Sequence, residues 1–209
     1  AVLEKALLER LLPHLEGGNL ANSLEMTEEE KAVIKGLHLL TMKPFLYICN
    51  RKNGSFNFDE HNDERWQELI EFFETTGAKY VVVDAGVEHE LKDLTDDEKT
   101  EFRREYGAQD SGVDNLIRAA YHRLGLMSFY TTGEKETRAW TIKQGSTAPI
   151  AGAAIHTDFR DKFIRAQVVS LQDLVHAGSK AAAKEAGKIR TEGKEYIVQD
   201  SDVIEFMHS

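Results

Sequence analysis

Apolar residues recur at helical spacing at the start of the chain. The pattern from Val2 to Leu15 predicts an amphipathic helix that Gly17 and Gly18 end. No Ser, Thr, Asp or Asn precedes this helix to cap its first turn. We therefore expect it to be a severed arm of a larger protein, and a processed or tagged terminus is the alternative.

A helix start signal and two apolar runs follow. Thr27 and Glu30 form a capping-box pattern, which predicts a second helix that continues to Leu40 and ends before Pro44. The runs Phe45–Cys49 and Lys79–Val83 are typical of strands buried on both faces of a parallel sheet. An apolar stripe over residues 63–75 lies between them and indicates a helix. This succession of strand, helix and strand predicts a βαβ unit.

The rest of the chain changes character after Leu124. Helical patterns that begin at Thr95 and run to Leu124 precede this point, and Gly125 is a helix stop. Beyond it the patterns predict strands at residues 137–143, 163–170, 196–198 and 203–207, and a helix over residues 171–187. Strands with helices over one face indicate a compact α+β module.

Charge separates the same two parts. The net charge of -10 falls entirely on residues 1–125, which hold 15 Lys and Arg against 25 Asp and Glu, whereas residues 126–209 hold 11 of each. The acidic part argues against non-specific binding to DNA, because that binding needs a basic surface. No apolar run approaches the length of a membrane span. The single cysteine excludes a disulfide framework and fits a reducing, cytoplasmic compartment.

Most motifs that mark catalysis are absent from the sequence. It contains no phosphate-cradling GxxxxGK[ST] loop, no HExxH, no paired CxxC, no GxSxG and no histidines at zinc-site spacing. His156 and Asp158 permit a catalytic pair, but a capped turn is the favoured interpretation. Cys49 lies in an apolar run, and a core position is favoured over a reactive thiol. No catalytic residue and no metal ligand is therefore assigned.

The ends of the two apolar strands are more informative. In open α/β sheets, ligands bind at the carboxyl ends of parallel strands, where Asn50 and the predicted loop Asp84–Gly86 lie. An amide side chain offers one donor group and one acceptor to a purine edge. Ala85 and Gly86 are small enough for a base to approach the backbone. A cap on its own loop is the alternative role for Asn50.

Several segments together resemble one family. They are Leu39–Asn50, Asp110–Arg118, Thr137–Ile142, Ala154–Phe159, Phe163–Ala166, Ala186–Lys188, Gly193–Asp200 and Asp202–Ile204. In these segments the chain is similar to the YchF/Obg-like ATPases along essentially its whole length. The resemblance implies an α/β plus α+β fold: a partial P-loop-type α/β domain with a helical-hairpin arm, followed by a β-grasp TGS domain. It assigns residues 1–38 to the arm, 39–124 to the C-terminal part of the nucleotide-binding domain and 125–209 to the TGS domain.

The resemblance also implies a residual base-binding half-site. Asn50 matches the first residue of the family's Asn-x-x-Glu motif, Arg51 is one of its middle residues, and Asn53 stands where the family has Glu. A second loop of the family matches Ala85, Gly86 and Val87. At Asp84, the position before them, this sequence departs from the family's pattern. An acid at position 53 would accept from guanine, whereas Asn53 offers a neutral amide. The choice between ATP and GTP, held with Mg²⁺ in the intact protein, therefore stays open.

The TGS domain resembles modules of threonyl-tRNA synthetases and stringent-response enzymes, which implies contact with RNA or the ribosome. The candidate phosphate contacts are Arg138, Lys143, Arg160, Lys162 and Arg165. Solvated surface charges matched by nearby acids are the alternative. We expect the C-terminal portion of a cytoplasmic, ribosome-associated ATPase that is inactive by itself. The rival interpretation is a non-enzymatic TGS docking module for RNA or a protein partner.

Overall fold

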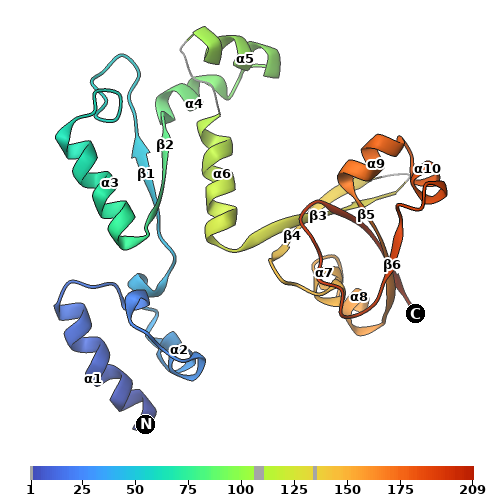
Figure 1. Ribbon diagram of the computed structural model, residues 1–209, viewed down its shortest axis with the longest axis horizontal. Coiled ribbons are helices and arrows are strands. Elements are labelled where there is room, and N and C mark those ends of the chain that lie inside the picture. Colours follow the sequence, from blue (N-terminus) through green and yellow to red (C-terminus); the bar gives the residue numbers. More distant parts are fainter. Residues whose placement is uncertain (1, 106–110, 134–135) are drawn as a thin grey trace. The chain divides into compact units, whose positions relative to one another are not determined.

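The computed structural model describes residues 2–105, 111–133 and 136–209 (Figure 1). Asp110, the first residue of one segment that resembles the family, lies outside them. The chain forms two compact units, Ala1–Leu116 and Ile117–Ser209, and each is described by itself. The division falls inside a helix, Gly112–Arg123. The domain boundaries expected after residues 38 and 124 stay predictions.

The first unit is built mainly of helices, with one pair of strands. Its elements are α1 (Val2–Glu16), α2 (Glu28–Ile34), β1 (Leu46–Asn50), α3 (Glu64–Thr76), β2 (Lys79–Val83), α4 (Ala85–Leu91), α5 (Asp96–Glu105) and the start of α6 (Gly112–Arg123), with 3₁₀ turns η1 (Ala21–Ser23), η2 (Lys35–Leu37) and η3 (Leu40–Met42). Of the helices in the described part of the chain, none combines the length and apolar character that a membrane span needs.

Helix α2 starts as the capping-box pattern predicts. Thr27 and Glu30 exchange both capping hydrogen bonds, and the Glu30 carboxylate also accepts from Arg10 at 2.7 Å. This ion pair ties α1 to α2 at a nearly buried carboxylate. The predicted extension to Leu40 is wrong. Helix α2 ends at Ile34, and His38 adopts a left-handed conformation (φ 50°) that stops the following 3₁₀ turn.

The βαβ unit is confirmed. Strands β1 and β2 pair in parallel, from Leu46 opposite Lys79 to Asn50 opposite Val83, and α3 packs along one face of the pair (Figure 1). Aromatic rings hold this face, because Phe73 of α3 stacks on Tyr80 at 4.5 Å and meets Tyr47 at 5.3 Å.

The expected burial of both strand faces is wrong. The side chain of Ile48 is 54% exposed, and Cys49 is half-buried rather than part of a closed core. The physical reason is the size of this sheet. It has two strands in the described part of the chain, and α3 covers the face on which Tyr47 and Cys49 lie. The opposite face, with Ile48, therefore stays open.

The second unit centres on a five-stranded sheet. Its elements are β3 (Leu126–Thr132), β4 (Thr137–Lys143), α7 (Ala148–Ala153), α8 (Asp158–Asp161), β5 (Phe163–Ser170), α9 (Leu171–Ala177), α10 (Lys180–Glu185), β6 (Arg190–Glu192) and β7 (Asp202–His208). The strand order is β4-β3-β7-β5-β6. β3 and β7 are parallel, and the other neighbours are antiparallel.

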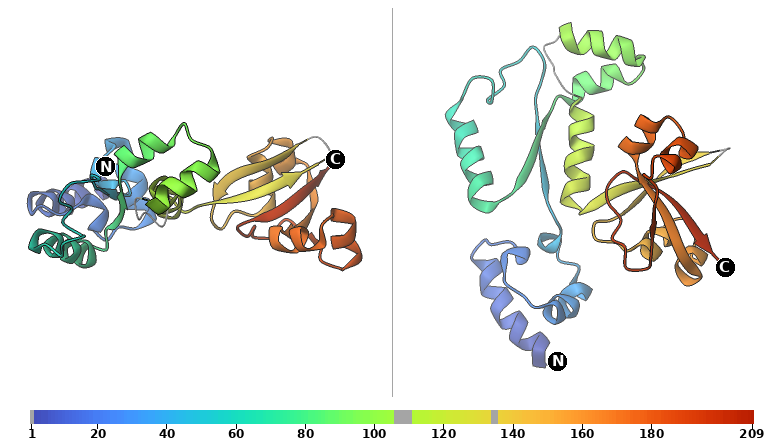
Figure 2. Two further views of the ribbon diagram at one scale, coloured as in Figure 1. Left: turned by 90° about the horizontal axis from the view of Figure 1, so that it is seen from above. Right: turned by 45° about the vertical axis from the view of Figure 1, so that its right-hand side comes forward.

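Helices cover the two faces of this sheet separately (Figure 2). On one face, Ala148 and Ala151 of α7 pack with Phe129 and Ile204 in the larger core. On the other face, Ala183 of α10 packs in a smaller core with strand residues that alternate with the first set. The sheet is thus buried on both sides over its central strands, rather than on one face as the sequence pattern predicts.

Two predictions for this unit are wrong, and the sequence pattern misses one strand. The predicted helix over residues 171–187 is two helices, because Gly178 adopts φ 76° and ends α9, and Ser179 caps α10. Residues 196–198 form a single bridge to Thr147 instead of a strand. Strand β3 was not anticipated, because its alternation is short and contains Ser and Thr at the open positions.

A buried carboxylate fixes the turn before β7. Asp202 is 3% exposed, and its Oδ2 accepts from the Tyr196 hydroxyl at 2.6 Å and from the Gln199 amide at 2.9 Å. Burial, together with this carboxylate, raises the pKa of Tyr196 to about 12. The tyrosine therefore stays a neutral donor, and the turn keeps its hydrogen bonds throughout the physiological pH range.

Gly152 is expected to be essential to the larger core. A Cβ at this position would lie 2.8 Å from the Cβ of Phe159 and 3.3 Å from a ring carbon of Phe206. Gly152→Ala should lower the free energy of unfolding of this unit by about 1–3 kcal/mol through overpacking. Urea unfolding followed by Trp140 fluorescence, in a Trp66→Phe background, measures it. Gly193→Ala is the matched control because its Cβ meets open space, and equal midpoints for the two variants would contradict the packing.

Candidate functional site

The carboxyl ends of β1 and β2 meet at one edge of the parallel pair. Asn50 is the last residue of β1 and lies opposite Val83, the last residue of β2. The ladder continues one step further, because the Arg51 amide donates to the Val83 carbonyl at 2.8 Å. The side chains that follow both strands are therefore neighbours, as the sequence predicts for this edge.

One hydrogen bond joins the two strand ends. The Asn50 side-chain oxygen Oδ1 accepts from the backbone amide of Ala85 at 3.0 Å, and both residues are exposed. Asn50 thus bonds to the segment after the neighbouring strand, which decides against a cap on its own loop. Its Nδ2 group has no partner among the described residues. It is consequently a free donor at the surface of the site.

The segment Asp84–Gly86 is not a loop, in contrast to the prediction. Asp84 is the N-cap of α4, and its Oδ1 accepts from the Val87 amide at 3.0 Å. Ala85 and Gly86 form the exposed first turn of that helix. A Cβ on Gly86 would lie 3.2 Å from Asp84 Oδ1, so a larger residue there would crowd the cap.

Arg51 is turned into the loop that follows β1. Its guanidinium forms an ion pair with Asp59 and lies 3.4 Å from Glu60. The side chain of Asn57 closes the same loop, because it accepts from the Lys52 amide at 3.0 Å and donates to the Lys52 carbonyl. The charge of Arg51 is therefore matched by loop acids.

Asn53 lies in the turn of this loop. The Ser55 amide donates to the Lys52 carbonyl at 3.2 Å, and Gly54 adopts φ 69°, which glycine tolerates at the turn centre. The exposed Asn53 side chain has no partner among the described residues. The structure thus brings Asn50 together with Ala85–Val87, and it places Arg51 and Asn53 in the adjoining loop.

A feature that the sequence did not reveal supports this edge. The Glu88 carboxylate of α4 accepts from the backbone amide of Gly112 at 2.6 Å, at the start of α6. A Cβ on Gly112 would lie 3.0 Å from Val83 Cγ1, so a larger residue there would require the Val83 side chain to shift. The partners are 24 residues apart and show no motif.

The residues considered for other chemistry do not form a catalytic site. His156 Nδ1 accepts from the backbone amide of Asp158 at 3.2 Å in a local turn. The favoured interpretation of a turn agrees with this, but its expected capping is wrong, because the Thr157 side chain makes no cap hydrogen bond and His156 supplies the acceptor. Burial raises the pKa of the Cys49 thiol, and the nearby Asp59 raises it further. The thiol is therefore poorly nucleophilic at neutral pH. Within the described ranges no three His, Cys, Asp or Glu side chains group around a metal position.

The five basic candidates of the second unit do not form one patch. At α8 and the residue after it, Arg160 pairs with Asp161 at 2.8 Å and Lys162 with Asp158 at 3.6 Å, so nearby acids match both charges. α8 packs on the face of the larger core, because Phe159 contacts Phe206.

The three remaining cations lie on the sheet itself. Arg138 stacks on the Trp140 ring at 4.2 Å, on the face of the larger core. Lys143 and Arg165 lie on the opposite face by strand alternation; Lys143 donates to a backbone carbonyl at 2.8 Å and Arg165 to a methionine sulfur at 3.1 Å. The five are divided between both faces, and their RNA contact stays a prediction.

Comparison with known proteins places this geometry in a family. A family model described as YchF-GTPase_C, Protein of unknown function (DUF933), matches residues 126–209. The chain is 45% identical over 206 residues to the ribosome-binding ATPase YchF of Bacillus subtilis (strain 168) and 43% identical over 207 residues to that of Escherichia coli O157:H7. Each alignment covers 99% of this chain and 56% of the relative. This chain belongs to the YchF family.

A solved YchF structure agrees with the fold. The structure of the Schizosaccharomyces pombe YchF GTPase superposes with a TM-score of 0.84 and 28% identity, over 98% of this chain and 54% of that one. The match confirms the predicted mixed α/β fold, and the chain corresponds to the C-terminal portion of YchF. It spans about half the length of the curated YchF relatives that it matches.

We expect Cys49 to titrate above an ordinary thiol. Because the neutral form is favoured in the fold, alkylation by iodoacetamide should have a pH midpoint above the value of about 8.5 for a free cysteine. Asp59→Asn should lower this midpoint, since it removes the carboxylate that opposes the thiolate. Cys49 is the single cysteine of the chain, so labelling reports it alone. A midpoint at or below that of the urea-unfolded chain would disprove the expected burial effect.

Proposed function

We propose that this chain is the C-terminal portion of a nucleotide-binding YchF protein that works with the ribosome. In it, Asn50 and Ala85–Val87 supply the base-binding half of the nucleotide site. The observation that carries the proposal is the hydrogen bond between Asn50 Oδ1 and the Ala85 amide, which fixes the side chain at the strand ends. Its setting in a chain that resembles the YchF ATPases over 99% of its length supports a nucleotide as the ligand.

The free Nδ2 group of Asn50 suits a purine. Adenine and guanine both present N7 as an acceptor, so one amide donor recognises either base. Ala85 and Gly86 leave the backbone open beside this donor. Asn53 supplies no carboxylate for the guanine N1 and N2 donors. The relatives are named as an ATPase in the bacteria and as a GTPase in S. pombe, and these residues favour neither base.

The intact protein would hold the phosphates and Mg²⁺ elsewhere. When bound, Mg²⁺ neutralises phosphate charge during phosphoryl transfer. The described residues offer no cluster for the ion, and the sequence has no phosphate-cradling loop. Residues 39–124 would therefore orient the base only, as the C-terminal part of a P-loop-type domain, with residues 1–38 in the helical arm. The open face of β1, with Ile48 54% exposed, supports a partial domain.

Residues 125–209 would act as a TGS domain of β-grasp type in the cytoplasm. The mixed order β4-β3-β7-β5-β6, with its one parallel pair, supports this assignment. A second candidate function is a non-enzymatic docking module for RNA or a protein partner. It is favoured by the family model, which matches residues 126–209 alone.

Nucleotide binding tests the half-site. Millimolar ATP or GTP should shift the NMR amide resonances of Asn50 and Ala85–Val87, and Asn50→Ala should weaken binding about fivefold to tenfold, the effect of one lost hydrogen bond. Asn22→Ala is the control, because Asn22 is an exposed amide in another part of this unit. Binding that survives Asn50→Ala unchanged would remove the half-site. We expect no phosphate release above background from this chain.

Ribosome binding tests the docking role. The chain should sediment with ribosomes at low salt and be released as salt rises, because phosphate contacts weaken with counterion release. Arg138→Glu together with Lys143→Glu should reduce the bound fraction. Arg160→Glu is the comparison, since Asp161 already matches that charge. Absence of the chain from the ribosome pellet at low salt would contradict the docking role.

A further inference from the structure

The five-stranded sheet has two edges that differ in protection. One edge is β6, which is three residues long and carries Arg190 and Glu192. The other is β4, which runs for seven residues without proline and pairs with β3 without a bulge (Figure 1). Short length, charge, proline and bulges are the usual means by which proteins block strand addition at an edge. β6 has two of them, whereas β4 presents a long and regular edge.

The outward backbone groups of β4 can be identified from its ends. The Gly133 amide donates to the Glu136 carbonyl, and the Gln144 amide donates to the Gly125 carbonyl. In an antiparallel ladder the bonded pairs alternate, so residues 138, 140 and 142 bond to β3. Thr137, Ala139 and Thr141 therefore direct both N–H and C=O away from the sheet. None of these groups has a partner within the described residues.

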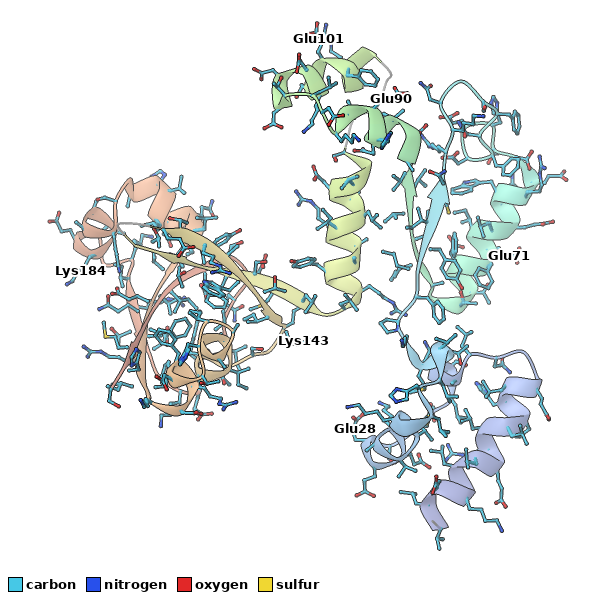
Figure 3. All side chains as sticks on the ribbon, turned by 180° about the vertical axis from the view of Figure 1, so that it is seen from behind. Glu28, Glu71, Glu90, Glu101, Lys143 and Lys184 are labelled. Carbon is cyan, nitrogen blue, oxygen red and sulfur yellow. The ribbon has the colours of Figure 1, made fainter. Side chains whose placement is uncertain are left out.

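Two of the three outward positions, Thr137 and Ala139, leave the edge open. At the third, the Thr141 hydroxyl shares a hydrogen bond of 3.0 Å with the hydroxyl of Tyr121 in α6. Thr137, Ala139 and Thr141 are small, uncharged and exposed. The two charges of β4 are Arg138 and Lys143, and both are positive. Arg138 keeps one side of its guanidinium free of the Trp140 ring, and Lys143, labelled in Figure 3, uses one of its three donors on a backbone carbonyl. The edge thus offers unpaired backbone between two cations.

This charge pattern selects among occupants. A second copy of β4 would add two further cations, Arg138 and Lys143, to an edge that already carries two, so electrostatic repulsion opposes that pairing. An RNA strand would meet the cations through its phosphates, which accept hydrogen bonds and therefore do not pair with the outward carbonyls. An extended peptide supplies alternate donors and acceptors, and acidic side chains on it would meet Arg138 and Lys143.

We propose that the free edge of β4 is a docking site for an extended acidic peptide, which adds as a sixth strand. Its backbone bonds to Thr137, Ala139 and Thr141, and its carboxylates lie near Arg138 and Lys143. Its partner class is an acidic, strand-forming segment of another protein.

The test uses the whole chain and a synthetic valine-rich peptide as long as β4 that carries glutamate at both odd and even positions. Successive side chains of a strand point to opposite faces, and Arg138 and Lys143 lie on different faces. At millimolar concentration the peptide should shift the amide resonances of Thr137, Ala139 and Thr141 more than those of β6. A peptide with lysine in place of glutamate should bind at least tenfold more weakly. Methylation of the peptide nitrogens on one edge should abolish binding, since it removes the donors that a strand needs.

Ala139→Pro is the decisive variant. Because the Ala139 amide faces outward, proline there removes one outward donor and leaves the ladder to β3 intact. It should weaken the peptide about tenfold, the effect of a lost hydrogen bond together with a steric block, while the resonances of β5 and β7 stay unchanged. Arg138→Glu should also weaken binding, and it leaves every backbone donor in place.

Four results would overturn the proposal. They are no amide shift at millimolar peptide, equal binding of the N-methylated peptide, dimerisation of the chain that Ala139→Pro abolishes, and shifts of the same amides by oligouridylate but not by the peptide. The third would assign the edge to a second copy, and the fourth would assign it to single-stranded RNA.

Discussion

The parallel pairing of β1 and β2 is the constraint on which the site depends. It brings the ends of two strands, 35 residues apart at Asn50 and Ala85, within one hydrogen bond of each other. The pairing is stabilised by the aromatic contacts of α3 on one face, chiefly Phe73 with Tyr80. Loss of this packing would separate Asn50 from the helix start that it contacts. The position of the Asn50 side chain therefore depends on the aromatic packing between α3 and the two strands.

The sequence predicted this part of the fold well, because the signals are local. The capping box at Thr27, the strand at Lys79–Val83 and the βαβ order depend on residue type and spacing within a few positions. The two main errors have different causes. The exposure of Ile48 reflects how many strands join the sheet, which no short window of sequence contains. The start of α4 at Ala85 follows from a local signal, the Asp84 N-cap three residues before Val87, which the small residues Ala85 and Gly86 led us to interpret as a loop.

The candidate site divides in the same way. Asn50 and Ala85 could be predicted as site residues from the sequence, because each lies just after a predicted strand and parallel strands place their carboxyl ends at the same edge of a sheet. The partners of Arg51 could not, since Asp59 and Glu60 are ordinary acids in a loop until the loop folds onto the strand end. The basic residues of the second unit show the limit of reasoning from type alone. Strand alternation places Arg138 and Lys143 on opposite faces.

The two units exploit their sheets differently. In the first, strand ends present an amide and open backbone. In the second, both faces are covered over the central strands, and the exposed backbone of β4 is what remains to interact. Both candidate surfaces therefore depend on unpaired polar groups that the fold holds in place.

The central claim is that the side-chain amide of Asn50 faces a purine base. The most direct measurement is an intermolecular nuclear Overhauser effect between the Nδ2 protons of Asn50 and the purine H8 proton, with ATP added to the chain. We predict a contact from H8 to these protons and to the amide of Ala85. Contacts from H8 to other residues, with none to Asn50, would contradict the account.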